Sequence, residues 1–348
     1  MSTITLKPAP SKTRHHIPIP SSSFPAGFTV GGLHVGVKKK VGVPDLALIL
    51  STSEHPTTAA ACFTRNAFKA APVIVSDQIL KRNGGYARAV VVNSGCANAV
   101  TGKQGLEDAW TMVKETDALL PKTSFKFERE TLVMSTGVIG QNLPISKIVA
   151  GIRSQSEKEI TRILGSDFTA WELAAEAFMT TDTFPKLRSR VFTIGGVEYR
   201  LAGMDKGAGM IHPNMGPAGT LFTSGKQQLH ATLLGCIMTD AAVSPRSLQN
   251  ALTYAVDRSF NSISVDGDMS TNDSIYVLAN GAASNGFTID EENTNDAYEV
   301  FKHELTDFAT DLAKLVVRDG EGATKFVTVT VKASLISLFY LSLTSLSE

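Results

Sequence analysis

Apolar and polar residues alternate along the chain in short blocks bounded by glycine and proline. Three apolar runs, at residues 46–50, 71–75 and 89–92, have the length and β-branched content of buried strands. Residues 275–278 and the alternating segment 325–332 predict two further strands. The pattern therefore predicts both fully buried and half-buried strands.

Helical patterns separate these strands. Asp167 is placed to cap a helix over residues 167–180, and Ser244-Pro245 opens a helix that reaches about residue 260. Further helices are expected over residues 105–119, 145–152 and 295–317, and a hairpin over 191–201 at Ile194-Gly195-Gly196. Because strands and helices interleave throughout, the fold class is α/β or α+β.

Composition and charge narrow the function classes. The 348 residues, 43% of them hydrophobic, can bury one large core or two ordinary ones. Lys+Arg and Asp+Glu are both 33, which disfavours a nucleic-acid partner, because phosphate binding needs an excess of basic residues. No apolar run reaches the roughly 20 residues of a membrane span. The nearest, residues 333–346, is broken by serines and predicts a buried strand.

The N-terminal residues have a composition of their own. The first acidic residue is Asp45, and before it basic side chains stand among many Ser, Thr and Pro. An acid-free, hydroxyl-rich basic segment is typical of an organelle transit peptide, here assigned to residues 1–24. Several prolines and a single arginine oppose an amphipathic helix there, so an untargeted N-terminal tail is the alternative.

Two segments resemble general binding motifs, but each departs from its motif at a required position. Residues 219–226 resemble a phosphate-binding loop, but the glycines are one residue too far apart and Gln227 replaces the magnesium-binding hydroxyl. Residues 266–273 resemble the start of a calcium loop, but Thr271 stands where the loop needs glycine, so a polar turn is predicted. The three cysteines form no CxxC and the histidines no HxxxH. No metal site is therefore predicted.

Three hydroxyl-rich segments remain as candidates. Residues 134–140 follow an apolar strand and can present backbone N–H groups at a turn of small residues. Residues 180–183 end an alanine-rich helix, and residues 231–240 place a threonine between a small residue and an apolar run. Threonines at the ends of helices and strands are usually structural, so each segment alone is a weak signal.

With their neighbours, these segments follow an ordered pattern over roughly residues 24–332. Its parts are FTRNAFKAAP (63–72), VVNSGCAN (91–98), STGVIG (135–140), TTDTFP (180–185), KGAGMIHPNM (206–215), ATLLG (231–235), DGDMSTND (266–273) and DGEGATK (319–325). In this order they strongly resemble the ornithine acetyltransferase family, the bifunctional enzymes of arginine biosynthesis, in its fungal mitochondrial form.

The resemblance implies an α/β fold, a layered sandwich of β-sheets flanked by helices, made by a precursor that cleaves itself. The cut falls between Ala231 and Thr232. It separates an α part, residues 25–231, from an incomplete β part, residues 232–332, and residues 333–348 form a tail outside the pattern. The freed Thr232 is the implied nucleophile. Its α-amine, with a reference pKa of about 7.7–8.0, is the local base.

The same resemblance implies the other site residues. Thr136 and Gly137 form the oxyanion hole, through a hydroxyl and a backbone N–H. An amino-acid substrate carries both charges and needs a partner for each. Lys206 and Glu321 match the family's substrate contacts, with Glu321 as the acidic contact to the ornithine amine. Without the family, both would be interpreted as ordinary solvated charges.

A threonine of residues 180–183 also binds substrate by resemblance, as does Thr232. Thr183 is favoured, with Thr181 next. The implied reaction is ping-pong: N-acetylornithine acylates Thr232, ornithine leaves, and glutamate accepts the acetyl group. Some members also accept acetyl-CoA. The resemblance implies a heterotetramer of α and β chains, the mitochondrial matrix, and no cofactor.

The chain departs from the family in two places. Fifteen additional residues, 216–230, stand just before the scissile bond, and residues 333–348 resemble nothing in the family. A loop-like insert there should hinder self-cleavage, because a misplacement of about 1 Å can cost around a hundredfold in rate. The alternative is therefore an inactive, truncated or mis-spliced member. A related aminopeptidase is disfavoured, because the segments around Lys206 and Glu321 match the acetyltransferases.

Overall fold

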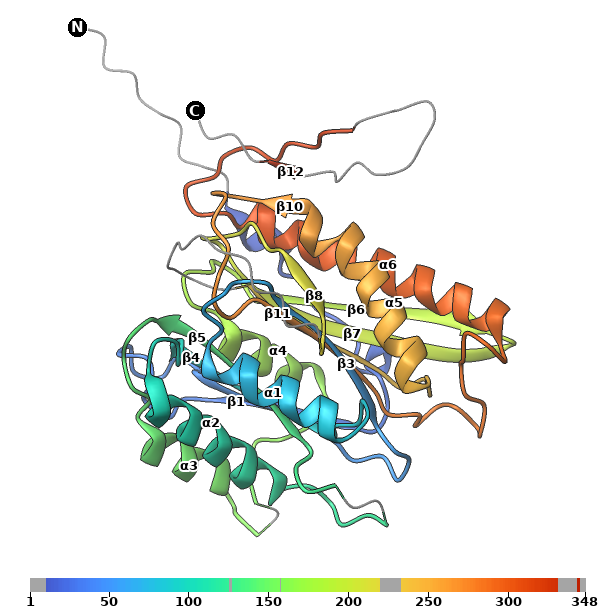
Figure 1. Ribbon diagram of the computed structural model, residues 1–348, viewed down its shortest axis with the longest axis horizontal. Coiled ribbons are helices and arrows are strands. Elements are labelled where there is room, and N and C mark those ends of the chain that lie inside the picture. Colours follow the sequence, from blue (N-terminus) through green and yellow to red (C-terminus); the bar gives the residue numbers. More distant parts are fainter. Residues whose placement is uncertain (1–10, 125–126, 157, 220–232, 331–342, 345–348) are drawn as a thin grey trace, which may run out of the picture.

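The computed structural model describes residues 11–124, 127–156, 158–219, 233–330 and 343–344. In this part of the chain, helices and sheets alternate in five layers (Figure 1). Helices α2 (Gly102–Asp117) and α3 (Ile145–Arg153) cover one sheet. Helices α1 (Ala71–Arg82) and α4 (Phe168–Phe178) lie between this sheet and a second one, and α5 (Pro245–Arg258) and α6 (Asn295–Arg318) cover the second sheet. This arrangement confirms the expected α/β sandwich of sheets flanked by helices.

The first sheet has four strands in the order β1-β2-β4-β5. Their bounds are Phe28–Leu33, Leu46–Ser51, Ala89–Cys96 and Thr131–Val138. β1, β2 and β4 pair antiparallel, and β4 pairs parallel with β5. Helices cover both faces, so β2 is buried along its whole length. That burial explains why the strand is a continuous apolar run in the sequence.

The second sheet has six strands in the order β6-β7-β9-β11-β3-β8. Their bounds are Lys186–Ile194, Val197–Lys206, Leu234–Thr239, Ser274–Ala279, Thr58–Thr64 and Met215–Pro217. β9 and β11 follow residue 232 in the chain, yet they lie between β7 and β3, which precede it. The parts on either side of the expected cleavage site therefore share one hydrogen-bonded sheet.

The helices agree with most of the expected positions. Their bounds are Ala71–Arg82 (α1), Gly102–Asp117 (α2), Ile145–Arg153 (α3), Phe168–Phe178 (α4), Pro245–Arg258 (α5) and Asn295–Arg318 (α6). Asp167 caps α4 by accepting a 2.9 Å hydrogen bond from the Ala170 N–H, as predicted. Gly195 and Gly196, at φ +58° and +83°, make the predicted turn between β6 and β7.

The strand predicted over residues 71–75 is wrong, because this segment begins α1. Pro72 stands in the first helical turn, where a missing N–H costs nothing. Val73 and Ile79, a turn and a half apart, are both buried in the core between the sheets. A five-residue apolar run does not distinguish a buried strand from the start of a buried helix.

The strand predicted over residues 325–332 is also wrong for the residues that the structure describes. Residues 325–330 pair with no strand and are mostly exposed. Their alternating apolar and polar side chains therefore do not belong to a half-buried strand. In the expected strand at 333–346, only 343–344 are described. They form β12, Leu343–Thr344, which pairs parallel with β10, Ile263–Ser264. The rest of that prediction lies outside the described residues.

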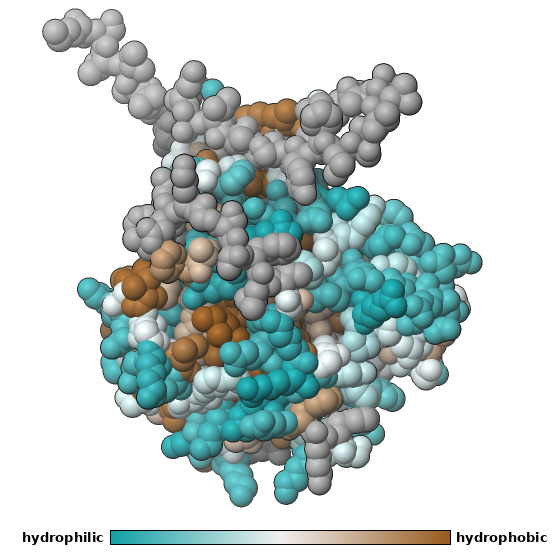
Figure 2. Space-filling view, in the orientation of Figure 1, coloured by the Kyte–Doolittle hydropathy of each residue, from teal (hydrophilic) through white to brown (hydrophobic). Residues whose placement is uncertain are grey.

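Short 3-10 helices complete the fold, at Lys12–His15 (η1), Ser21–Ser23 (η2) and Phe260–Ser262 (η3). The face shown in Figure 2 is mainly hydrophilic, with hydrophobic side chains gathered in a few places. Among the described helices, none combines the length and the apolar character that crossing a membrane requires.

Candidate functional site

A cleft of about 1320 Å³ brings together four residues that the sequence predicted for the site. Gly137 comes from the end of β5, Thr181 and Thr183 from the segment after α4, and Glu321 from the segment after α6. These three segments are far apart in the chain. The fold therefore brings together residues that only the family resemblance had grouped.

The end of β5 is shaped by two glycines that face each other. Gly137 has φ +123° and pairs with Gly95 of β4, which has φ +120°. A Cβ on Gly137 would lie 2.3 Å from the backbone carbonyl carbon of Gly95, so no other residue fits there. Thr136, the residue before Gly137, is fully buried.

The predicted polar turn at 266–273 supports this strand end. The Asn272 side-chain amide donates hydrogen bonds to the carbonyls of Ser135, at 2.9 Å, and Ala97, at 2.7 Å. Both carbonyls therefore have a hydrogen-bond donor in the protein interior, where an acceptor without a partner would lower the stability of the fold. The turn before β11 is confirmed, and its asparagine ties it to the ends of β4 and β5.

Lys206 lies next to the same strand end. It is the last residue of β7 and is buried, and its Nζ donates to the Thr136 hydroxyl at 3.4 Å. Burial lowers the pKa of Lys206 below its usual value, against the opposing effect of Asp182 and Asp273. The predicted Lys206 and Thr136 are thus direct neighbours.

A buried ammonium stands behind the cleft. Lys186, the first residue of β6, lies 2.6 Å from an Asp182 oxygen and 2.7 Å from an Asp319 oxygen, and none of these three side chains is exposed. Burial alone would lower the pKa of Lys186, but Asp182 and Asp319 outweigh it and raise the pKa. Burial would likewise raise the pKa of Asp182, but Lys186 and Lys206 hold it well below its usual range. Lys186 and Asp182 therefore face each other as an ion pair.

The two carboxylates hold the backbone of the site. Asp182 accepts hydrogen bonds from the N–H groups of Thr180, at 2.9 Å, and Gly207, at 2.8 Å. Asp319 accepts from the Thr183 N–H at 2.9 Å and from the Thr183 hydroxyl at 2.5 Å. Through them, Lys186 links the segments that carry Thr181 and Thr183, Lys206, and Glu321.

Glu321 reaches the cleft beside the glycines that follow Lys206. Its N–H donates to the Ala208 carbonyl at 2.6 Å, and its carboxylate lies against Gly209. A Cβ at Gly209 would come within 2.9 Å of the Glu321 carboxylate carbon. Because Gly209 has no side chain, there is space for the Glu321 carboxylate beside it. Glu321 is exposed and lines the cleft.

The expected cleavage site, Ala231 and Thr232, lies outside the described residues. The next residue, Leu233, is buried, and its N–H donates to an Asp273 oxygen at 2.9 Å. Burial raises the pKa of Asp273 to about 7, although hydrogen bonds from Leu233 and Ser270 act in the opposite direction. Asp273 thus fixes the start of β9 and titrates near neutral pH.

The lysine run at 38–40 was interpreted from composition as part of a basic N-terminal region. In the fold it lines the cleft. Asp45 holds this loop by accepting hydrogen bonds from four successive backbone N–H groups, those of residues 35–38. Burial lowers the pKa of Lys38 to about 8. This wall of the cleft is therefore basic, while Glu321 is acidic.

The insert expected at residues 216–230 begins as a strand. Gly216 and Pro217 belong to β8 and pair with β3, and the Gly219 N–H donates to an Asp77 oxygen at 2.7 Å. The expectation that the insert is loop-like is therefore wrong for its first residues. Residues 220–230 lie outside the described part.

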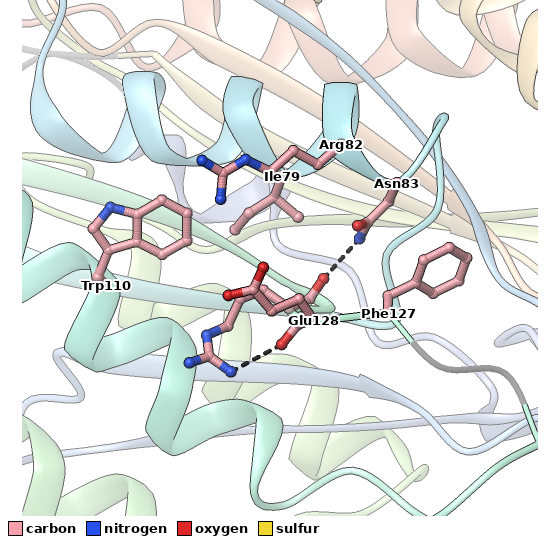
Figure 3. Close-up of a pocket in the computed structure, with 7 residues that line it drawn as sticks. Ile79, Arg82, Asn83, Trp110, Phe127 and Glu128 are labelled. Carbon is pink, nitrogen blue, oxygen red and sulfur yellow. Dashed lines mark hydrogen bonds between the residues drawn. The ribbon is translucent and has the colours of Figure 1, made fainter.

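A second, smaller pocket of about 380 Å³ lies between α1 and α2 (Figure 3). Its lining consists of Ile79, Arg82, Asn83, Trp110, Phe127, Glu128 and Arg129. The Asn83 amide donates to the Arg129 carbonyl there at 2.7 Å. No predicted site residue is among the lining residues, so the larger cleft is the candidate active site.

Several site residues were not identified from the sequence, namely Asp182, Lys186, Asp319, Asn272 and Asp273. Four of them lie inside the quoted motifs, where they look like ordinary polar turn residues. Lys186 had one weak signal: it is a charged residue that directly follows a proline, shortly before the hairpin predicted over residues 191–201. Asp182 stands four residues before it, but the other partner, Asp319, is 133 residues away and could not be inferred from it.

Comparison with known proteins places these residues in a family. A model described as the ArgJ family matches residues 29–335. The mitochondrial arginine biosynthesis bifunctional protein ArgJ of Coprinopsis cinerea is 80% identical over 94% of this chain and 68% of its own length. The protein of the same name from Laccaria bicolor is 77% identical over 96% of this chain and 69% of its own length.

Among solved structures, the arginine biosynthesis bifunctional protein argJ of Bacillus halodurans is similar at 36% identity. The match covers 57% of this chain and 95% of that chain, with a TM-score of 0.49. The present chain spans about two thirds of the length of the two fungal relatives.

Replacing Lys186 by Met should lower the free energy of unfolding by about 3–5 kcal/mol at neutral pH, because Asp182 and Asp319 would stay buried without the ammonium that contacts both of them. The loss should shrink in acid. In the unmodified protein, the stability from the lowered Asp182 pKa is fully present above the unfolded value of about 3.9 and is lost only as the pH falls through the folded value. At about pH 4.5 it is still present, and the loss shrinks because the carboxylates of the variant take up protons there. Urea unfolding at about pH 4.5 and about pH 8 measures both effects.

Arg190→Met is the matched control on the same strand. Arg190 lies 3.2 Å from Glu304 and 2.9 Å from Asp311 at the surface, with 27% of its side chain exposed. Arg190→Met should lower the free energy of unfolding by no more than about 1 kcal/mol. Equal losses in the two variants, or a Lys186→Met loss that is the same at both pH values, would contradict the assigned role of the buried cluster.

Proposed function

The chain belongs to the ArgJ family, and we propose that its cleft transfers the acetyl group of N-acetylornithine to glutamate through Thr232. As a member of this family it is an acyltransferase of arginine biosynthesis that acts on ornithine and glutamate substrates, and it is mitochondrial like its fungal relatives. These relatives give no support to the alternative of an inactive member. The observation that best supports the proposal is the contact of Lys206 with Thr136 beside the cleft.

In the first half-reaction, the Thr232 hydroxyl oxygen attacks the acetyl carbonyl carbon while the α-amine of the same residue takes the hydroxyl proton. The carbonyl oxygen becomes an oxyanion, for which Thr136 and Gly137 are the proposed donors. Lys206 donates to the Thr136 oxygen and so leaves the Thr136 hydroxyl proton for the oxyanion. Collapse breaks the C–N bond, and the departing ornithine amine takes a proton from the Thr232 ammonium.

In the second half-reaction, the glutamate amine attacks the acetyl-threonine ester and the same donors hold the new oxyanion. The Thr232 α-amine takes a proton from the attacking glutamate nitrogen and gives it to the Thr232 oxygen as the ester C–O bond breaks, which gives N-acetylglutamate and free enzyme. For the substrate charges, we assign the ornithine side-chain amine to Glu321, the exposed anion of the cleft. Lys206 is assigned as the second substrate contact, and the basic loop at 38–40 adds positive charge to the cleft wall.

The shared sheet supports the two-chain form of the enzyme. After a cut at 231–232, β9 and β11 would remain hydrogen-bonded between β7 and β3. The α part, 25–231, and the β part, 232–332, would therefore stay together as one folded unit, the building block of the expected heterotetramer. Acetyl-CoA as a second donor is also part of the proposal, and the cleft volume of about 1320 Å³ leaves room for a donor larger than N-acetylornithine.

Intact mass spectrometry and an acetyl-transfer assay test the nucleophile. The purified chain should separate into fragments that end at Ala231 and begin at Thr232, whereas Thr232→Ala should stay one chain of 37.1 kDa without transfer activity. Thr136→Ala should lower kcat by about 10²–10³. The control Thr111→Ala changes a threonine on α2 that donates only within its own helix, and it should behave like the unmodified chain.

Transfer at the normal rate by Thr232→Ala would contradict the assignment of the nucleophile. An uncut, inactive unmodified chain would instead favour the inactive alternative, in which the insert at 216–230 prevents cleavage.

The two candidate threonines can be separated kinetically. Asp319 fixes the Thr183 hydroxyl, whereas the Thr181 hydroxyl is exposed and has no described hydrogen bond. A hydroxyl that is already oriented binds a substrate at less entropic cost. Thr183→Val should therefore raise KM for N-acetylornithine about tenfold, and Thr181→Val by no more than about twofold. The reverse order would assign the contact to Thr181.

A further inference from the structure

Residues 12–24 pack against the folded body, although their composition is that of a leader. Phe24 is only 6% exposed, and its ring stacks on Trp171 of α4 with centroids 4.7 Å apart and planes 4° apart. Ile19 packs against the same hydrophobic core. A segment that is removed on import has no need of such complementary contacts with the mature protein.

Polar contacts extend this packing over α4 and the β6–β7 hairpin. The Ser21 hydroxyl accepts a 3.1 Å hydrogen bond from the first helical N–H of α4, that of Phe168. His16 lies 2.8 Å from a Glu172 oxygen on the same helix. Two arginines donate to backbone carbonyls of the segment, Arg188 to His15 at 2.8 Å and Arg200 to Ser22 at 2.7 Å.

One contact is made to the residue next to Glu321, which lines the cleft. The Lys12 ammonium donates to the Gly320 carbonyl at 2.7 Å. Gly320 stands between Asp319, which holds Thr183, and Glu321, which lines the cleft. Glycines flank Glu321 on both sides, and glycine backbones are conformationally permissive. A hydrogen bond to the Gly320 carbonyl therefore restricts the part of the chain from which Glu321 projects.

We propose that residues 12–24 remain in the mature enzyme as a strap, and that Lys12 is a positioning residue for Glu321. Any leader then ends before Lys12, earlier than the boundary at residue 24 that composition suggests. Lys12 acts through the Gly320 carbonyl and does not touch substrate. The kinetic part of this proposal rests on the proposed function, because it assumes that Glu321 binds the ornithine amine.

The N-terminus of the mature protein tests the strap directly. The full chain is expressed in a fungal cell, purified from the mitochondria, and its N-terminal peptide is identified by mass spectrometry. The first residue should lie at or before Lys12. A mature protein that begins beyond Lys12 would overturn the proposal.

Two deletions test the packing without reference to catalysis. Removal of residues 2–10 should leave the thermal midpoint unchanged. Removal of residues 2–24 should lower it by several degrees, since Trp171 and the first turn of α4 lose their partners. Equal midpoints for the two deletions would refute the strap, whatever the reaction that the enzyme catalyses.

Lys12→Met tests the positioning role, with Arg14→Met as the matched control. Arg14 stands on the same 3-10 helix, and its only described hydrogen bond is to the neighbouring His15. Lys12→Met should raise KM for N-acetylornithine by about three- to tenfold with kcat changed less, while Arg14→Met changes neither. Lys12→Arg, which keeps a donor, should restore most of the affinity.

The same KM in the Lys12→Met and Arg14→Met variants would overturn the role of Lys12. An unmodified enzyme that transfers no acetyl group from N-acetylornithine would count against the proposed function instead. The N-terminal mapping and the deletions would then still decide whether the strap exists.

Discussion

The cleft depends on one buried ammonium group. Lys186 has no exposed surface and lies within 2.7 Å of two carboxylates, Asp182 from the segment before β6 and Asp319 from the segment after α6. Isolated charges in such a place would be too costly, so each member of the cluster requires the others. The carboxylates in turn accept hydrogen bonds from Thr180, Thr183 and Gly207, so the geometry of three site segments follows from this single arrangement.

The second constraint is the shared six-stranded sheet. Its central strands come from both sides of residues 231–232, and Asp273, at the start of β11, holds the first described residue beyond them. The two parts of the chain therefore share one hydrogen-bonded sheet within a single uncut chain. A cut at the proposed site would leave this pairing intact, so the two products would stay together.

Local signals predicted the parts of the fold that local interactions determine. The Asp167 cap and the Gly195-Gly196 turn each involve residues within a few positions, and both were visible in the sequence. The start of α1 was predicted incorrectly, because a short apolar run fits a helix and a strand equally well. β3 was not predicted either, since its alternation of Ala, Cys and Phe carries little hydrophobic contrast.

For the site, the family pattern identified residues but not the interactions that place them. Thr136, Lys206 and Glu321 were named from motifs, and the fold brings them to one cleft and its border. Lys186 could not be predicted, because the contact that gives it a role spans 133 residues of sequence. The family motifs identify the residues assigned to contact the substrate. The buried charges that hold those residues in place, such as Lys186, can be recognised only in the folded structure.

The central claim is that these segments form one substrate site, and a crystal structure of the chain with bound ornithine tests it most directly. The account predicts ornithine in the cleft, with its side-chain amine within hydrogen-bond distance of the Glu321 carboxylate and its other groups facing Thr183 and Lys206. Ornithine bound elsewhere, or bound in the cleft without contact to Glu321, would contradict the account.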